Sequence, residues 1–249
     1  TSIASEKYSF ALENNQHASK FEKLTIGLPK LGFQERETDT ALIEIQKVLE
    51  GLGHKFVEIE LPNIDASIPS YYVIASAEAS TNLSRYDGVR FGYRCEAPKN
   101  LQDLYVRTRS EGFGEEVKRR ILTGTYALSV GYFDQYYLKA QKIRRLIARD
   151  FHAAFADVDL ILTPTTPSTA FELESLIDNP VEMYQQDLFT VPANLAGLPA
   201  ISIPCGFRNE MPIGAQFIAN AFKEDLLISV SREFQKETDF HDRTPNNSL

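Results

Sequence analysis

The chain has 249 residues, of which 43% are hydrophobic, 24% charged and 11% aromatic, and this composition excludes wholesale disorder. The formal net charge is −8, which argues against a protein that binds nucleic acid by itself, because such proteins concentrate positive charge. No apolar run reaches the roughly 20 residues of a membrane span.

Side chains that could do chemistry are few and scattered. The chain has two cysteines, Cys95 and Cys205, which are too few for a disulfide framework or a four-sulfur zinc site. Free thiols are typical of a reducing cytosol. The four histidines show no metal-ligand spacing, so we expect no metal site. GxGxxG, GxxxxGK[ST] and GxSxG are absent, and the residues alone reveal no complete catalytic constellation.

The N-terminal part predicts a parallel βαβ unit. Residues 1–23 are polar and read as a leading arm. Residues 24–29 form a short apolar run closed by glycine and proline, which is typical of a buried strand. Apolar residues recur at spacings of three and four over residues 36–52 and predict an amphipathic helix. Residues 55–62 alternate and predict the second strand, so the two strands should be parallel.

The middle of the chain is predicted to be helical. Residues 67–85, 100–109 and 114–123 favour helices. The clearest helix is expected over residues 126–156. Its apolar face is marked by Phe133, Tyr136, Ala140, Ile143, Ile147, Phe151 and Phe155.

The opposite face of that long helix carries a basic stripe of Lys142, Arg145 and Arg149. Such a stripe could contact a nucleic acid or a partner subunit. We favour the simpler interpretation, a solvated helix face.

The C-terminal part predicts three strands and two helices. In chain order we expect a strand at 158–163, a helix at 180–191, strands at 200–204 and 213–218 that pair as a hairpin, a helix at 223–237 and a frayed tail at 244–249. The loop at 163–170 follows a strand end, where ligands often bind, although a surface loop stiffened by proline is the favoured interpretation. The whole order indicates a mixed α/β fold with helices covering a sheet.

Four stretches carry a resemblance to a known family. They are residues 77–90 (AEASTNLSRYDGVR), 110–121 (SEGFGEEVKRRI), 131–137 (GYFDQYY) and 194–199 (NLAGLP). From about Lys23 to the closing helix, the chain resembles the C-terminal half of proteins of the amidase signature family. The second and third stretches are similar in particular to the glutamine-hydrolysing subunits of tRNA-dependent amidotransferases. The resemblance implies the mixed sheet of that family and makes residues 1–249 the C-terminal part of a single amidase domain.

The resemblance also implies an activity. The family uses a serine nucleophile, a second serine in a cis peptide and a lysine base, and all three are expected upstream of Thr1. No catalytic residue is therefore expected in this chain, which should be inactive alone. The complete protein would hydrolyse glutamine through an acyl-enzyme. A partner subunit would use the ammonia with ATP and Mg²⁺ to convert Glu-tRNA(Gln) to Gln-tRNA(Gln).

The assembly that this implies is a cytoplasmic heterotrimer. It would contact tRNA through the complex and would not involve a membrane. No cofactor is expected in this subunit.

Three substrate contacts are implied in this chain. The resemblance places Arg120 and Asp187 where the family holds the charged α-groups of glutamine, and Tyr71 where a tyrosine lines the same pocket. A guanidinium can bind a carboxylate through two hydrogen bonds, and a carboxylate can accept from an ammonium. Without the resemblance, Arg120 and Asp187 would be ordinary solvated helix residues, and Tyr71 beside Tyr72 would be core packing.

Other singled-out residues are expected to be structural. Gly197 and Pro199 fix turns, and Gln216 lies in the apolar run of the last predicted strand. Arg85 and Asp87 could pair as a buried bridge.

Two alternative functions stay open. The chain could belong to another amidase that acts on a different small amide, which would not need the charges of both Arg120 and Asp187. It could also be a non-catalytic binding module, since a chain of this length can bury its own core.

Overall fold

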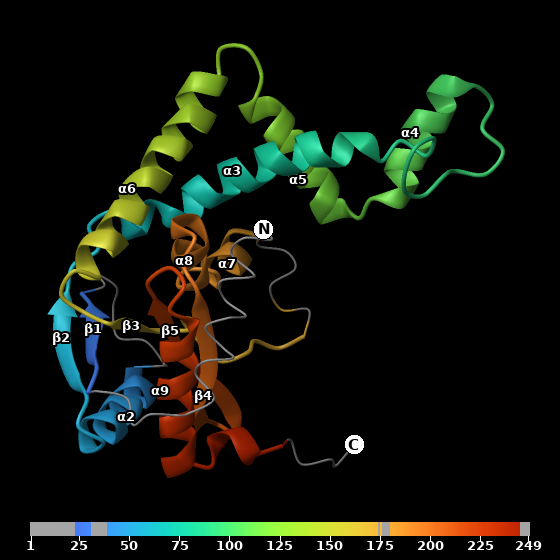
Figure 1. Ribbon diagram of the computed structural model, residues 1–249. Helices are drawn as coiled ribbons and strands as arrows, with labels where there is room; N and C mark the ends of the chain where they lie inside the picture. The colour runs from blue at the N-terminus through green and yellow to red at the C-terminus, as the bar shows by residue number, and fades with distance from the viewer. Residues whose placement is uncertain (1–22, 31–38, 174, 176–179, 245–249) are drawn as a thin grey trace. The chain divides into compact units, whose positions relative to one another are not determined.

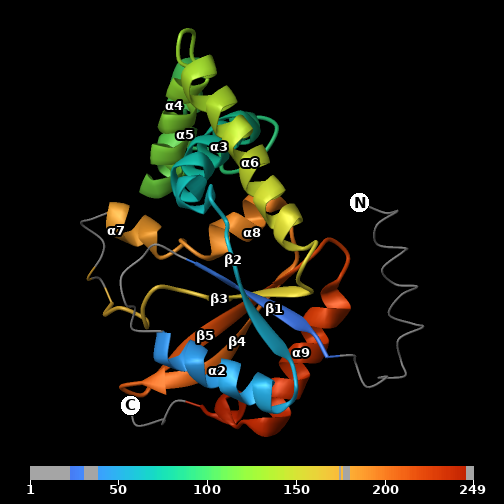
Figure 2. The same ribbon diagram turned by 90° about the vertical axis from the view of Figure 1, so that its left-hand side faces the viewer.

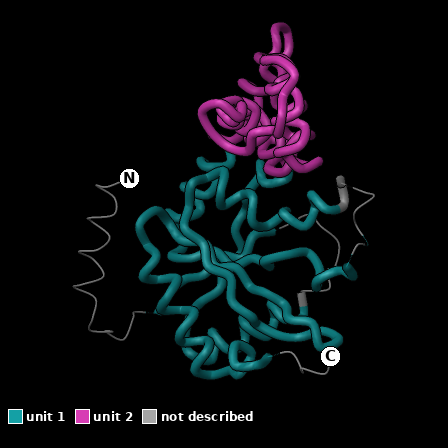
Figure 3. Tube along the Cα trace, turned by 90° about the vertical axis from the view of Figure 1, so that its right-hand side faces the viewer, with its two compact units in different colours: residues 1–65, 146–249 teal, residues 66–145 magenta. Residues whose placement is uncertain are grey.

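The computed structural model describes residues 23–30, 39–173, 175 and 180–244. The chain divides into two compact units, with residues 1–65 and 146–249 in unit 1 and residues 66–145 in unit 2 (Figure 3). The predicted leading arm and C-terminal tail lie outside the described residues, apart from Lys23 and Thr244. Both stay predictions.

Unit 1 contains a five-stranded mixed sheet (Figure 1). Its strands are β1 (Thr25–Pro29), β2 (Lys55–Ile59), β3 (Leu160–Pro164), β4 (Ala200–Arg208) and β5 (Met211–Ala219), arranged in the order β2-β1-β3-β5-β4. Strand β1 is parallel to β2 and β3, whereas β5 is antiparallel to β3 and β4. The predicted parallel βαβ unit, the hairpin and the mixed sheet are confirmed.

Helices α2 (Asp39–Gly51) and α9 (Glu224–Glu237) pack with the sheet into one apolar core (Figure 2). Both helices lie where the three- and four-residue periodicity predicts them. The core includes Ile45 and Leu49 from α2, Phe234 from α9 and Phe217 from β5, none of which is accessible to solvent. Burying these side chains supplies the main stabilisation of the sheet.

Strand β5 divides its side chains between two environments. Ile213, Ala215, Phe217 and Ala219 belong to the core beneath α2 and α9. Alternation along a strand turns Gln216 to the opposite face of the sheet. The register pairs Gln216 with Thr163 of β3 and with Ser202 of β4. A polar row therefore crosses the three strands on the face opposite the core.

Unit 2 is helical. It contains α3 (Ser67–Asn82), α4 (Leu101–Gly112), α5 (Glu115–Ala127), a π-helical segment, Phe133–Leu138, and the start of α6 (Lys139–Ala154), which belongs to unit 1 from Leu146 on. Helices α3 and α5 approach closely at Gly124, where a Cβ atom would overlap the Ser76 carbonyl and lie 2.9 Å from the Ala77 amide nitrogen. A glycine permits this approach because it has no side chain.

The single long helix predicted over residues 126–156 is wrong. Helix α5 runs on to Ala127, and the chain then turns through Gly131, whose φ of 89° is unfavourable for other residues. The regular helix resumes at Lys139. Ala140, Ile147 and Phe151 are buried as predicted, but Phe133 and Tyr136 are exposed. The apolar spacing continued across a turn that the periodicity does not reveal.

The helix predicted over residues 180–191 is also interrupted. The structure has two short helices, α7 (Pro180–Gln185) and α8 (Thr190–Ala196). Pro192 has no N–H, and in a continuous helix its ring would collide with the carbonyl of Leu188. In the first turn of a new helix a proline is tolerated, so the chain breaks before α8.

Both cysteines are free and buried. Burial raises the pKa of the Cys205 thiol to about 12, which makes this thiol a poor nucleophile. Among the helices that the structure describes, none is both long and apolar enough to cross a membrane.

We expect Gly124→Ala to destabilise the protein by about 1–3 kcal/mol, because a methyl group there overpacks the contact between α3 and α5. Gly51→Ala is the matched control, since a Cβ at Gly51 meets no atom of the described chain within 4 Å. It should change stability little or increase it slightly. Urea denaturation followed by circular dichroism measures both. Equal unfolding midpoints for the two variants would contradict the close approach.

Candidate functional site

Arg120 is held from two sides within unit 2. Its Nε lies 3.2 Å from Glu116 Oε1, one turn earlier on α5, and its Cζ lies 6.0 Å from the centre of the Tyr72 ring. The Nε atom is buried and makes no aligned hydrogen bond with the described residues, although the side chain as a whole is 39% exposed. The pair with Glu116 and the contact with Tyr72 thus both involve Arg120 within unit 2.

Tyr71 and Tyr72 stand next to each other on α3. Their rings meet edge to face, with centroids 5.0 Å apart. Adjacent helix residues point about 100° apart, and Tyr72 is the one that contacts Arg120. The role of Tyr71 in lining a substrate pocket stays a prediction.

Asp187 lies in the turn between α7 and α8. Its carbonyl accepts hydrogen bonds from the backbone N–H of Val191 at 3.0 Å and from Thr190 Oγ1 at 3.3 Å. These bonds tie its backbone to the first turn of α8. Asp187 belongs to unit 1, whereas Arg120 and Tyr71 belong to unit 2. A pocket shared by the three residues stays a prediction.

Gln216 links the sheet to the segment that carries Asp187. The side chain is 5% exposed, and its Nε2 donates to the Phe189 carbonyl at 2.8 Å and to Thr163 Oγ1 at 3.0 Å. The expectation that Gln216 is structural is confirmed, but sequence reasoning missed its partners. A polar amide in an otherwise apolar strand is the signal that could have identified a buried hydrogen-bond network.

Gly197 has the structural role expected of it, whereas the turn-fixing role of Pro199 stays a prediction. Gly197 ends α8 with a φ of 72°, a left-handed conformation that favours glycine. The Pro199 carbonyl accepts a hydrogen bond from the Ala219 amide at 3.0 Å.

The loop after β3 is attached to the same region. Thr165 Oγ1 and Ser202 Oγ are 2.6 Å apart, and the Thr165 amide donates to the Gly214 carbonyl at 2.9 Å. Farther along, Ser168 Oγ donates to Gln186 Oε1 at 3.3 Å. This loop therefore contacts both the polar row of the sheet and the residue before Asp187.

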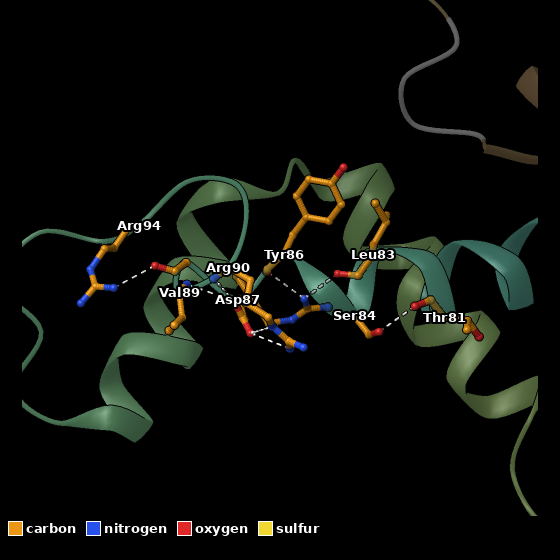
Figure 4. Close-up of polar contacts among 10 residues, drawn as sticks. Thr81, Leu83, Ser84, Tyr86, Asp87, Val89, Arg90 and Arg94 are labelled. Atoms are coloured by element: carbon orange, nitrogen blue, oxygen red, sulfur yellow. Dashed lines mark hydrogen bonds and ion pairs between the residues drawn. The ribbon is translucent and has the colours of Figure 1, made fainter.

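Asp87 organises a loop in unit 2, but its predicted partner is wrong. Its carboxylate accepts from the backbone amides of Val89 and Arg90 at 2.9 and 3.0 Å, and from Arg90 Nε and a terminal nitrogen at 3.0 and 2.8 Å (Figure 4). Arg85 is exposed. The hydrogen bonds and the Arg90 charge hold the pKa of the Asp87 carboxyl well below its usual value. Arg90 lies three residues after Asp87, and its side chain folds back over the turn to reach the Asp87 carboxylate.

The basic stripe of α6 and the candidate metal ligands complete the set of singled-out residues. Lys142, Arg145 and Arg149 are not buried, as expected for a solvated helix face. In the parts of the chain that the structure describes, no group of three or more His, Cys, Asp or Glu side chains could hold a metal ion.

Comparisons with known proteins agree on one family. The family described as Amidase matches residues 4–228. The A subunit of glutamyl-tRNA(Gln) amidotransferase from Hahella chejuensis is 55% identical over 243 residues, which cover 96% of this chain and 49% of that protein. Its counterpart in Pseudomonas aeruginosa is 54% identical, with 89% of this chain and 46% of that protein covered. The chain spans about half the length of these curated relatives.

Solved structures give the same result. The A subunit of glutamyl-tRNA(Gln) amidotransferase from Thermotoga maritima has a TM-score of 0.65 and 38% identity, covering 86% of this chain and 42% of that one. The K. lactis urea amidolyase has a TM-score of 0.66 and 23% identity, covering 93% of this chain and 13% of that one. The latter likeness concerns the fold alone.

We expect Asp87→Asn and Arg90→Gln to lower the free energy of unfolding at neutral pH, whereas Arg85→Gln should not. A carboxyl with a depressed folded-state pKa contributes stability above its unfolded value of about 3.9, and loses it as the pH falls below that value. The difference in the free energy of unfolding between wild type and Asp87→Asn should therefore become smaller in acid. Urea denaturation at several pH values measures it. A loss of stability in Arg85→Gln as large as in Arg90→Gln would contradict the assigned pairing.

Proposed function

This chain belongs to the amidase family, and we propose that it forms the C-terminal part of the glutamine-hydrolysing subunit of a tRNA-dependent amidotransferase. The observation that carries the proposal is the 55% identity to the A subunit of a glutamyl-tRNA(Gln) amidotransferase across 96% of this chain. Hydrolases with other substrates match the fold at much lower identity, such as the urea amidolyase at 23%.

The proposed substrate contacts are those of a free amino acid. Arg120 binds the α-carboxylate of glutamine through its two terminal nitrogens, and Asp187 accepts hydrogen bonds from the α-ammonium. Tyr71 lines the same pocket. The contacts of Arg120 support this role, because Glu116 Oε1 lies 3.2 Å from its Nε and the Tyr72 ring lies 6.0 Å from its Cζ, and neither contact is to a terminal nitrogen. Two parallel hydrogen bonds from the terminal nitrogens suit a carboxylate.

The chemical step is proposed to depend on groups outside this chain. A serine oxygen bonds to the amide carbon of glutamine, a lysine takes up and returns the proton, and ammonia leaves. Water then releases glutamate from the acyl-enzyme. This chain binds and orients the substrate, and by itself it should be inactive.

The proposed assembly also accounts for the fate of the ammonia. Other subunits, in a cytoplasmic heterotrimer, use it with ATP and Mg²⁺ to amidate Glu-tRNA(Gln). Contact with tRNA is made through the complex.

We expect Arg120→Ala and Asp187→Asn, made in the complete protein, to raise the KM for glutamine by about tenfold to a hundredfold, the usual effect of losing a hydrogen bond to a charged group. Ammonia release at varied glutamine concentration measures it. Arg119→Ala is the matched control, because Arg119 is the neighbouring arginine, is more exposed and also pairs with Glu116. An unchanged KM for glutamine in both Arg120→Ala and Asp187→Asn would instead favour an amidase for an uncharged amide.

A further inference from the structure

We propose that Gln216 is a positioning residue for Asp187 and thereby sets the preference for substrates that carry an α-ammonium group. The inference rests on the proposed glutamine pocket. It adds a residue that lies in the sheet and acts through the backbone of the segment that carries Asp187.

The orientation of the Gln216 side chain is fixed by its surroundings. A side-chain amide has two N–H donors, and Nε2 has two acceptors, the Phe189 carbonyl at 2.8 Å and Thr163 Oγ1 at 3.0 Å. At 5% exposure, water cannot easily replace either acceptor. Thr163 is also the residue paired with Gln216 in the register of β3 and β5. The amide of Gln216 therefore donates one hydrogen bond within the sheet, to Thr163, and one to the segment between α7 and α8, at Phe189.

The bond to Phe189 acts close to Asp187. Phe189 follows Asp187 by two residues, precedes α8 and is 2% exposed. The Asp187 carbonyl in turn accepts from the amide of Val191 and the hydroxyl of Thr190. The backbone from Asp187 to the first turn of α8 is thus one hydrogen-bonded segment, and Gln216 fastens it to the sheet. A shift of Phe189 would move Asp187 with it.

This attachment matters for recognition of a charged group. The energy of an ion pair depends on the distance between the charges and on how well the hydrogen bonds align. A carboxylate displaced by about 1 Å loses much of its advantage. A displaced Asp187 therefore weakens the binding of a substrate that has an α-ammonium group and does not affect a substrate that lacks one. Glutaramate, which is glutamine without the α-amino group, makes this comparison possible.

The test is the ratio of kcat/KM for glutamine to kcat/KM for glutaramate, measured by ammonia release with the complete protein. We expect Gln216→Met, which keeps the length of the side chain and removes its donors, to lower the ratio about tenfold through the KM for glutamine. Hydrolysis of glutaramate should stay close to wild type. A simple loss of stability would lower kcat/KM for both substrates by the same factor and leave their ratio unchanged.

Thr163→Val is the matched control. It removes the other acceptor of the same amide and leaves the bond to Phe189 in place, so it should reduce stability and keep the wild-type ratio. Gln216→Asn, one methylene shorter, replaces Gln216→Met if the latter does not fold, with the same expected result.

Asp187→Asn separates the two proposals. A lower ratio in Asp187→Asn with a wild-type ratio in the Gln216 variant would overturn the positioning role alone. An unchanged ratio in Asp187→Asn would overturn the proposed pocket. A lower ratio in Thr163→Val equal to that in Gln216→Met would also overturn the positioning role, because the Phe189 bond would then not be the cause.

Discussion

The antiparallel placement of β5 between β3 and β4 is the constraint on which the rest of unit 1 depends. Because side chains alternate along a strand, one face of β5 must fill the core under α2 and α9, while the other face cannot contribute to it. Ala215 and Phe217 are fully buried in that core, and Gln216 lies between them. A rigid apolar layer on one side thus fixes the position of a polar side chain on the other.

The polar face would be a liability if its groups had no partners. A buried amide without hydrogen bonds costs about 1–3 kcal/mol. Here the partners come from a strand and from the α7–α8 segment, so satisfying Gln216 also orders the chain next to Asp187. The bond that satisfies Gln216 therefore also holds the backbone two residues after Asp187. A substitution at Gln216 is expected to affect both stability and recognition.

Much of the architecture follows from local patterns. The patterns of residues 36–52 and 223–237 predict α2 and α9 because each helix buries one continuous face. Periodicity fails where a turn interrupts a helix without changing the apolar spacing. Gly131 turns the chain before α6, and Pro192 forces a break before α8. Both residues are visible in the sequence, but spacing alone does not say that they end a helix.

The candidate site could be predicted less completely, for a different reason. Arg120, Asp187 and Tyr71 come from motif resemblance, which identifies positions and not contacts. That Asp87 pairs with Arg90 and not with Arg85 depends on the turn that follows Asp87, where Gly88 has a φ of 75° and its amide donates to the Phe91 carbonyl. The partner of Gln216 across the sheet depends on strand register, and its second partner lies 27 residues away. Neither partner is encoded in the local sequence.

The two charged residues of the proposed pocket are held in place by different parts of the structure. Arg120 is oriented by neighbours on regular helices of unit 2, Glu116 one turn away and Tyr72 on α3. The pair with Glu116 is partly exposed and contributes little to stability, so its main effect is to orient the guanidinium. Asp187 lies in a turn, its carbonyl is bonded to the first turn of α8, and Gln216 binds the carbonyl of Phe189 two residues later. Carboxylate recognition should therefore tolerate changes in the sheet, whereas ammonium recognition should be sensitive to them.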